Sequence, residues 1–398
     1  MINRITFLAA LVVCASPVSA QMITRLDGSY IAVAEADSFA RATLRTAHVT
    51  GAQIAVINGG KLVWSAAYGL RQRDPDLPMD RGTTTWLGSI TKPIFATYVM
   101  QLVERGEFNL DEPVARQLAK PLNAYPAYRE TAADVIGDSL WPRITPRMLL
   151  AHTSGLANFA FVEPDRKMHL HSVPGALYRY SGEGINLLQF IIEQKMHLPL
   201  DMLMHDAILA PLRMNGSGLV HRKEFESNIA DRFDLDEKFL AKTRRSPARG
   251  AGSMSTTAED VAAFVVAYMG GRVVQPATRA QMLRPAIGIT SLHQFPLARN
   301  EPEGQEAKDV GLAYGLGWGL LTKTPFGPAF FKEGHGDGAQ NYVICFERQQ
   351  SCMIILTNSD NGELAFRPLL EKILGDTATP WEWEGYTPSY VRETRKQQ

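Results

Sequence analysis

The pattern of apolar and polar residues changes twice along the chain. Near the start, residues 31–48 (IAVAEADSFARATLRTAH) carry apolar side chains at helical spacing, which predicts a helix. Residues 52–69 (AQIAVINGGKLVWSAAYG) then alternate on both sides of Asn58-Gly59-Gly60, a sequence typical of a tight turn between antiparallel strands. The chain is therefore expected to open with a helix followed by a β-hairpin.

Helical spacing dominates from about residue 81 to residue 282, and polar loops at 125–146 and 221–250 interrupt it. Strand patterns return after this region, and an amphipathic helix is predicted for residues 362–375. The later predicted strands lie at residues 311–323, 329–336, 339–346 and 351–358.

Strands at both ends of the chain, with helices between them, predict an α+β fold. We expect one antiparallel sheet made from N- and C-terminal strands, flanked by the terminal helices, with a large helical region inserted. The sheet subdomain is placed at about residues 21–80 and 311–398, and the helical subdomain at about 81–310. Chemistry is expected where the two parts meet.

The first twenty residues have the pattern of an export signal. Arg4 supplies a positive charge, residues 5–14 are apolar, and Val18-Ser19-Ala20 has the small residues of a cleavage site. The apolar run is too short to span a bilayer, and Cys14 lacks the preceding small residue of a lipoprotein signal. We therefore predict cleavage after Ala20, a periplasmic or secreted protein of residues 21–398, and no membrane anchor afterwards.

Cys345 and Cys352 flank a short polar segment between two apolar runs, which predicts a hairpin with the two cysteines facing each other. In an oxidising compartment they could form a disulfide, but directly opposed strand positions are unfavourable for one. Packing as two small apolar side chains is slightly favoured, and both interpretations stay open.

Composition limits the kinds of partner. The chain has 398 residues, of which 45% are hydrophobic, so it can bury a large core without metal or disulfide support. Its 41 basic residues balance 41 acidic ones, and no basic surface is expected that would attract nucleic acid. A small molecule or peptide is the expected partner, and the oligomeric state is left open.

Candidate chemistry begins at residues 83–95, TTTWLGSITKPIF. A helix is predicted from Ser89 to Gly106, with Pro93 tolerated in its first turns and Gly106 as its end. Lys92 then lies one turn after Ser89 on the same face. Partly buried near the positive helix end, its amine is expected to have a lowered pKa and to accept the serine proton. Taken alone, the spacing also fits a helix cap and a solvent-exposed lysine.

Six blocks in order decide between these interpretations, and in order and spacing they resemble the serine beta-lactamase and penicillin-binding superfamily. The class C branch, with its related esterases and D-stereospecific peptidases, is the most similar. The resemblance covers nearly all of the chain after the leader. The blocks are WLGSITKPIFATYVMQLVERGEFNLDEPV, ITPRMLLAHTSGL, PGALYRYSGEGINLLQ, GAGSMSTTAEDVAAF, YGLGWGL and GHGDGAQNYVICF.

The resemblance implies roles for further residues. Ser89 and Lys92 match the first family motif, and Tyr180 matches the tyrosine of the second, which shares protons with the lysine and serine and activates the water that releases the acyl group. Gly182 stands where the family usually has an asparagine that contacts the substrate amide. Substrates without that amide, such as esters, are therefore favoured.

The third motif is Lys-Thr-Gly or His-x-Gly, and it is matched to His335 in EGHGDGAQNY, because Pro325 in the alternative KTP lacks a strand N–H. Gly338 then aligns with the residue whose N–H completes the oxyanion hole, together with the backbone N–H of Ser89. Asp337 replaces the usual glycine and is expected to oppose anionic substrates. Histidine is also a weaker fixed cation than lysine.

These residues predict an exported serine hydrolase that acts through an acyl-enzyme on an ester, amide or beta-lactam. The alternative is a binding or regulatory module that has kept the fold and lost its chemistry. No cofactor or metal is expected, because His169 and His171 lack a third ligand of suitable spacing. His152 is interpreted as structural. No Gly-x-Ser-x-Gly motif is present, which argues against an alpha/beta-hydrolase.

Overall fold

The computed structural model describes residues 21–294 and 304–386. The predicted leader, residues 1–20, lies outside the described residues. In the described ranges, no helix combines the length and apolar character needed to cross a bilayer.

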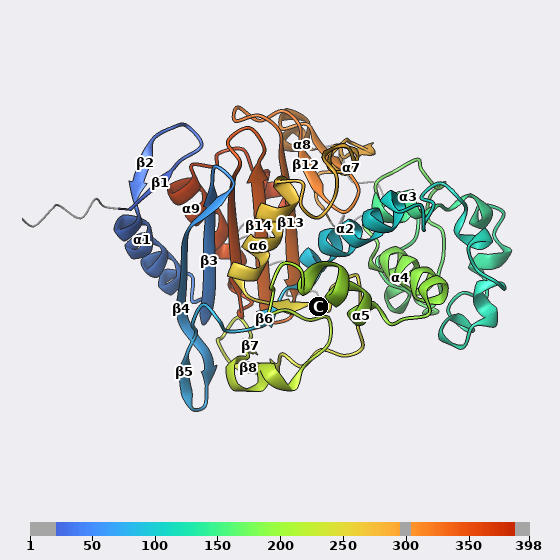
Figure 1. Cartoon of the computed structure of the whole chain (residues 1–398), viewed down its shortest axis with the longest axis horizontal. Coiled ribbons are helices and arrows are strands. Elements are labelled where there is room, and N and C mark those ends of the chain that lie inside the picture. Colours follow the sequence, from blue (N-terminus) through green and yellow to red (C-terminus); the bar gives the residue numbers. More distant parts are fainter. Residues whose placement is uncertain (1–20, 295–303, 387–398) are drawn as a thin grey trace, which may run out of the picture.

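The centre of the molecule is a nine-stranded antiparallel sheet (Figure 1). It joins strands from both ends of the chain, which confirms the predicted α+β fold. In spatial order its strands are β10 (Ile287–Gly288), β11 (Leu312–Tyr314), β12 (Gly319–Leu321), β13 (Ala329–Gly336), β14 (Ala339–Phe346), β15 (Ser351–Thr357), β3 (Gly51–Asn58), β4 (Lys61–Arg73) and β5 (Asp76–Pro78).

Three two-stranded ladders lie outside the sheet: β1 (Met22–Thr24) with β2 (Tyr30–Ala32), β6 (Thr85–Trp86) with β9 (Ser255–Thr256), and β7 (Asp231–Phe233) with β8 (Phe239–Lys242). The α-helices are α1 (Val33–Thr46), α2 (Thr91–Glu104), α3 (Pro146–Leu150), α4 (Gly182–Met196), α5 (Leu200–Met204), α6 (Ala258–Met269), α7 (Pro276–Met282), α8 (Gln305–Asp309), α9 (Glu363–Leu369) and α10 (Trp381–Glu384).

The sheet is buried on both faces. Because side chains alternate along a strand, Ile54 and Val56 of β3 pack with α1 and α9 in one core, whereas Ala55 and Ile57 pack in the other, which contains α2 and α6. Figure 1 shows α1 and α9 on one side of the sheet and α6 across the other. The helices from α2 to α5 extend away from the sheet and form the inserted region.

The tight hairpin turns have the geometry that the sequence predicted. Gly59 and Gly60 both have positive φ angles, 54° and 71°, as required between β3 and β4. At the same end of the sheet, Cys345 lies opposite Cys352 in the register of β14 and β15, with their Cα atoms 4.1 Å apart. A disulfide joins them, so the slightly favoured interpretation of simple apolar packing was wrong. The direct cross-strand register brings the two sulfur atoms into bonding contact.

The disulfide gives a testable stability prediction. Its two cysteines are seven residues apart in sequence, and cross-linking so short a loop stabilises a fold by about 2 kcal/mol. Iodoacetamide is expected to leave denatured, unreduced protein of residues 21–398 unmodified and to add two groups after reduction, as read by intact mass. Reduction should lower the free energy of unfolding by about that amount in urea. Alkylation without reduction would contradict the bond.

Candidate active site

Ser89 lies in a short 3-10 helix, η1 (Gly88–Ile90), that leads directly into α2. α2 is apolar on nearly all sides, and every residue from Thr91 to Met100 is buried. A helix of this kind is held firmly in the core. The Ser89 side chain itself is only partly buried, so a rigid backbone carries a hydroxyl that a substrate can reach.

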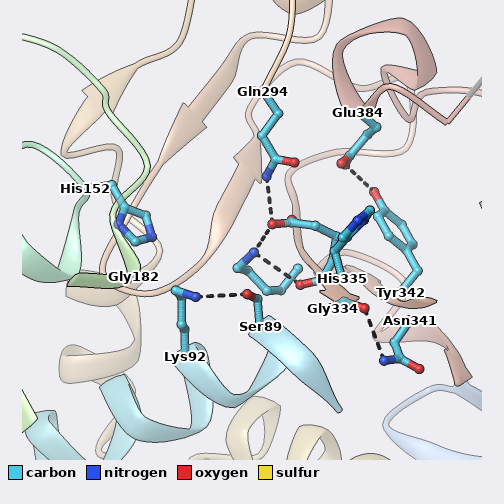
Figure 2. A network of polar contacts seen from close by, with 12 residues as sticks. Ser89, Lys92, His152, Gly182, Gln294, Gly334, His335, Asn341, Tyr342 and Glu384 are labelled. Carbon is cyan, nitrogen blue, oxygen red and sulfur yellow. Dashed lines mark hydrogen bonds and ion pairs between the residues drawn. The ribbon is translucent and has the colours of Figure 1, made fainter. Parts of the chain in front are cut away.

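Two glycines allow the Ser89 turn to lie against the strand β13. A Cβ atom on Gly88 would lie 2.9 Å from the Gly334 carbonyl carbon and 3.1 Å from the His335 nitrogen. One on Gly334 would lie 2.1 Å from the Leu87 oxygen, so neither position has room for a side chain. The Asn341 amide donates to the Gly334 carbonyl at 3.1 Å, which ties β14 to this contact (Figure 2).

Lys92 forms the predicted contact with Ser89. Its amine donates to the Ser89 Oγ at 2.9 Å and to the Ala251 carbonyl at 2.6 Å, and the residue is 1% exposed (Figure 2). Burial, and then the positive charge of Lys332, hold the pKa of Lys92 well below its usual value. This shift favours the neutral amine, whose lone pair can accept the serine proton.

Tyr180 lies between two lysines, immediately before α4. Its ring centroid is 4.8 Å from the Lys92 Nζ and 4.9 Å from the Lys332 Nζ. Burial raises the pKa of Tyr180, while the charge of Lys332 and hydrogen bonding to Ser89 and Lys332 oppose the rise. The phenol thus stays protonated and links the serine to both lysines.

Lys332 was not among the residues singled out from the sequence. It lies on β13 and is fully buried, in an ion pair with Glu333. Burial alone would lower the pKa of Lys332, but the Glu333 charge and Tyr180 outweigh it, and the net shift is upward. The pKa values of the two lysines on either side of Tyr180 are thus shifted in opposite directions. The signal that could have found it is Lys332-Glu333-Gly334, a Lys-x-Gly spacing three residues before the predicted match.

A buried acidic network supports this ion pair from the C-terminal end of the chain. The Gln294 amide donates to Glu333 at 2.7 Å, and the Tyr342 hydroxyl donates to the Glu384 carboxyl at 2.9 Å (Figure 2). Burial, and then the negative charge of Glu333, raise the pKa of Glu384 well above its usual value. The network therefore combines one anion with a protonated acid, and it orients Glu333 toward Lys332.

The predicted third motif needs correction at both of its residues. The His335 imidazole pairs with Glu363 of α9 at 2.7 Å and is 49% exposed, so it is the His335 backbone that lies against the Ser89 turn. The Gly338 N–H, predicted to complete an oxyanion hole, donates instead to Asp360 at 2.7 Å. The physical reason is the place of Gly338 in the hairpin. β13 ends at Gly336, so Gly338 lies in the turn before β14, beyond the strand segment that faces Ser89.

His152 occupies the structural position expected for it. It is fully buried, its Nδ1 accepts from the Ser181 N–H at 3.2 Å, and its ring centroid lies 4.4 Å from that of Tyr180. Burial, and then the charges of Lys92 and Lys332, hold the pKa of His152 well below its usual value, so it is neutral.

His169 and His171 pair with separate carboxylates, Asp165 and Glu163. Across the described residues, no group of three potential metal ligands occurs.

Gly182 begins α4, whose N-cap Ser181 accepts from the Gly184 N–H at 2.9 Å. A Cβ atom on Gly182 would lie 2.4 Å from the Phe159 ring, and the Gly182 N–H donates to the Asn158 side chain at 2.9 Å. Phe159 stacks on Phe161 with ring centroids 5.0 Å apart. An aromatic ring thus fills the space that a side chain at Gly182 would need.

This packing predicts that Gly182→Ala is destabilising. The added methyl group overlaps the Phe159 ring, and overpacking of this kind costs about 1–3 kcal/mol. Urea denaturation should show that loss for Gly182→Ala, and a smaller additional loss when the substitution is made in a Phe159→Ala background. Equal losses in both backgrounds would show that Phe159 is not the obstacle.

Comparison with known proteins gives one family. The family model described as Beta-lactamase matches residues 36–374 of the chain. The chain is similar to esterase EstB from Burkholderia gladioli, with 31% identity over 221 residues, which span 49% of this chain and 53% of EstB. The match thus covers about half the length of that relative.

A second relative is matched over most of its length. Penicillin-binding protein 4 from Amycolatopsis lactamdurans is 25% identical over 366 residues, 84% of this chain and 88% of that protein. Among solved structures, the octameric penicillin-binding protein homologue from Pyrococcus abyssi superposes with a TM-score of 0.70 at 21% identity, covering 92% of this chain and 81% of that one. This structural likeness confirms the fold.

Proposed function

Because the chain belongs to the Beta-lactamase family, we propose that it is an exported serine hydrolase in which Ser89 forms an acyl-enzyme. The observation that carries the proposal is the 2.9 Å contact between the Ser89 Oγ and the buried Lys92 amine, whose pKa burial holds low. A neutral amine at hydrogen-bond distance is the base that a serine nucleophile needs near neutral pH.

In the first step, the Ser89 oxygen attacks the substrate carbonyl and its proton passes to Lys92. Collapse of the tetrahedral intermediate breaks the bond to the leaving group, which takes a proton relayed from Lys92 through the Tyr180 hydroxyl. Water then gives a proton to Lys92 through the Tyr180 hydroxyl and attacks the acyl carbonyl. The bond to the Ser89 oxygen breaks, that oxygen regains its proton from Lys92, and the carboxylic acid leaves. Lys332 holds a positive charge beside Tyr180 throughout, which favours any negative charge developing on the phenol.

The oxyanion is assigned to the backbone N–H groups of Ser89 and His335. The His335 nitrogen is assigned because it lies beside the Ser89 turn, 3.1 Å from where a Cβ atom on Gly88 would lie. The Gly338 N–H is not assigned because it donates to Asp360. Backbone donors fixed in this way stabilise the charge that develops in the transition state.

Carboxylic esters are the substrates we favour. Gly182 provides no side-chain amide for a peptide or beta-lactam substrate, the Phe159 ring fills the space of a side chain there, and the neighbouring Asn158 amide oxygen is engaged by the Gly182 N–H. Esterase activity is also what the name of the relative EstB describes. Beta-lactams and D-amino-acid amides are the competing substrates that an assay has to include.

The nucleophile is tested with a fluorophosphonate and p-nitrophenyl butyrate. We expect one covalent adduct per chain by intact mass, none in Ser89→Ala, and a loss of ester hydrolysis of at least about a thousandfold in that variant. Nitrocefin turnover, measured in parallel, should be slower than ester turnover. Absence of any adduct would overturn the proposal and favour a binding or regulatory module.

The charge arrangement gives a pH prediction. Neutral Lys92 is the active form, so kcat/KM should rise with pH through a pKa below the usual lysine value. Lys332→Met removes a positive charge that lowers the pKa of Lys92 and leaves Glu333 to raise it, so this rise should move to higher pH. Lys332→Arg keeps the charge and should leave the rise near its original position. A profile that does not move in Lys332→Met would contradict the coupling.

A further inference from the structure

Two arginines lie over Trp86, three residues before the nucleophile. The guanidinium carbon of Arg245 is 4.0 Å from the centroid of the Trp86 ring, and that of Arg232 is 5.1 Å from it. Arg232 belongs to β7, and Arg245 lies in the segment that follows β8. Both side chains are half-buried, and placing two positive charges beside one ring is unfavourable unless a negative charge compensates them.

Neither guanidinium has a carboxylate partner among the described residues. Arg232 donates to the Asp337 carbonyl at 2.6 Å, and its Nε is buried without a hydrogen-bond partner. The Arg245 guanidinium lies over the Trp86 ring and forms no hydrogen bond or ion pair with a side chain in the same described part of the chain. The neighbouring Arg244 differs, because it is paired with Glu226 at 2.6 Å.

Burial acts on the pKa values of both arginines. Burial, and then the charge of Arg232, lower the pKa of Arg245, while Asp337 opposes the shift. Burial also lowers the pKa of Arg232, and the charges of Asp337 and Asp360 oppose that shift. The cluster therefore keeps guanidinium hydrogen-bond donors that the described residues do not satisfy.

The Trp86 ring connects this cluster to the nucleophile. Its Nε1 donates to the Gly252 carbonyl at 2.6 Å, and a Cβ atom on Gly252 would lie 3.7 Å from the Ser89 nitrogen. On its other side, the ring packs against Gly336, where a Cβ atom would lie 2.1 Å from the Trp86 Cη2. The arginines are thus about one indole ring away from the Ser89 backbone.

The order of residues along β13 gives the site a direction. Lys332 lies beside Tyr180, Gly334 lies beside the Ser89 turn, and Gly336 lies beside Trp86. In the proposed mechanism the leaving group takes its proton at the Tyr180 end. The acyl part of a substrate bound to Ser89 then extends toward the opposite end, where the arginines lie.

We propose that Arg245 and Arg232 bind a carboxylate on the acyl part of the substrate, so that the preferred substrates are monoesters of dicarboxylic acids. This assignment rests on the proposed function, because it takes its direction from the place of proton transfer. Planar guanidinium groups match a carboxylate with paired hydrogen bonds, and stacking on an indole ring holds them in place. The two arginines also offset Asp337, which was expected to oppose anionic substrates.

The test compares two esters of the same length, mono-p-nitrophenyl glutarate and p-nitrophenyl valerate, after subtraction of spontaneous hydrolysis. We expect wild-type protein to prefer the glutarate ester. In Arg245→Gln the ratio of the two kcat/KM values should fall about tenfold, mainly through KM for the anionic ester. Arg244→Gln, which removes a charge one residue away, is the matched control and should leave the ratio near the wild-type value.

The same change in both variants, or no preference for the glutarate ester in wild type, would overturn the carboxylate site. If no ester hydrolysis depends on Ser89, the proposed function fails, and the arginine site is then tested by binding alone. Ligand-observed NMR of glutarate with Ser89→Ala protein should show binding that is lost when Arg245→Gln is added. Equal binding by the two proteins would overturn the site.

Discussion

The burial of the Lys92 amine is the constraint on which the rest of the site depends. An isolated ammonium group in a dry core is so unfavourable that a lysine there gives up its proton instead. α2 produces this condition by surrounding Lys92 with apolar residues, and the Ala251 carbonyl fixes the amine so that it faces Ser89. Burial in the core thus makes Lys92 the base, and Lys92 needs no partner of opposite charge for this role.

A second buried lysine keeps this arrangement from being symmetrical. Lys332 has Glu333 beside it, which favours its charged form, whereas Lys92 contacts no carboxylate among the described residues and its pKa is held low. Environments that push the pKa values of like groups apart are what assign acid and base roles within one site. The helix α10 contributes Glu384 to this environment. Burial raises the pKa of Glu384 and favours its protonated form, so it adds little negative charge beside the pair of Lys332 and Glu333.

The sequence predicted the parts of the site that are local. The helix after Ser89, the contact with Lys92 and the bounds of β13 and β14 all follow from spacing over a few residues. Tyr180 came from the resemblance to a family. Lys332 was missed because it interrupts an apolar strand pattern, where its burial depends on Glu333 and on side chains from distant segments.

Features made by long-range packing could not be predicted in this way. The Gly338 N–H donates to Asp360, which lies 22 residues further along the chain, and no local spacing indicates that contact. The filling of the Gly182 position by Phe159, and the stacking of Arg245 on Trp86, join segments whose contact no periodicity indicates.

The departures from the family pattern have a common physical direction. The Phe159 ring fills the space of a side chain at Gly182, and the arginines proposed to bind a substrate carboxylate, Arg232 and Arg245, lie over Trp86 beside the far end of β13. The reacting groups are held by buried elements: Ser89 by η1 against β13, and Lys92 by α2 and the Ala251 carbonyl. Substrate choice can therefore change through the surrounding loops while the buried base, which sets the chemistry, stays the same.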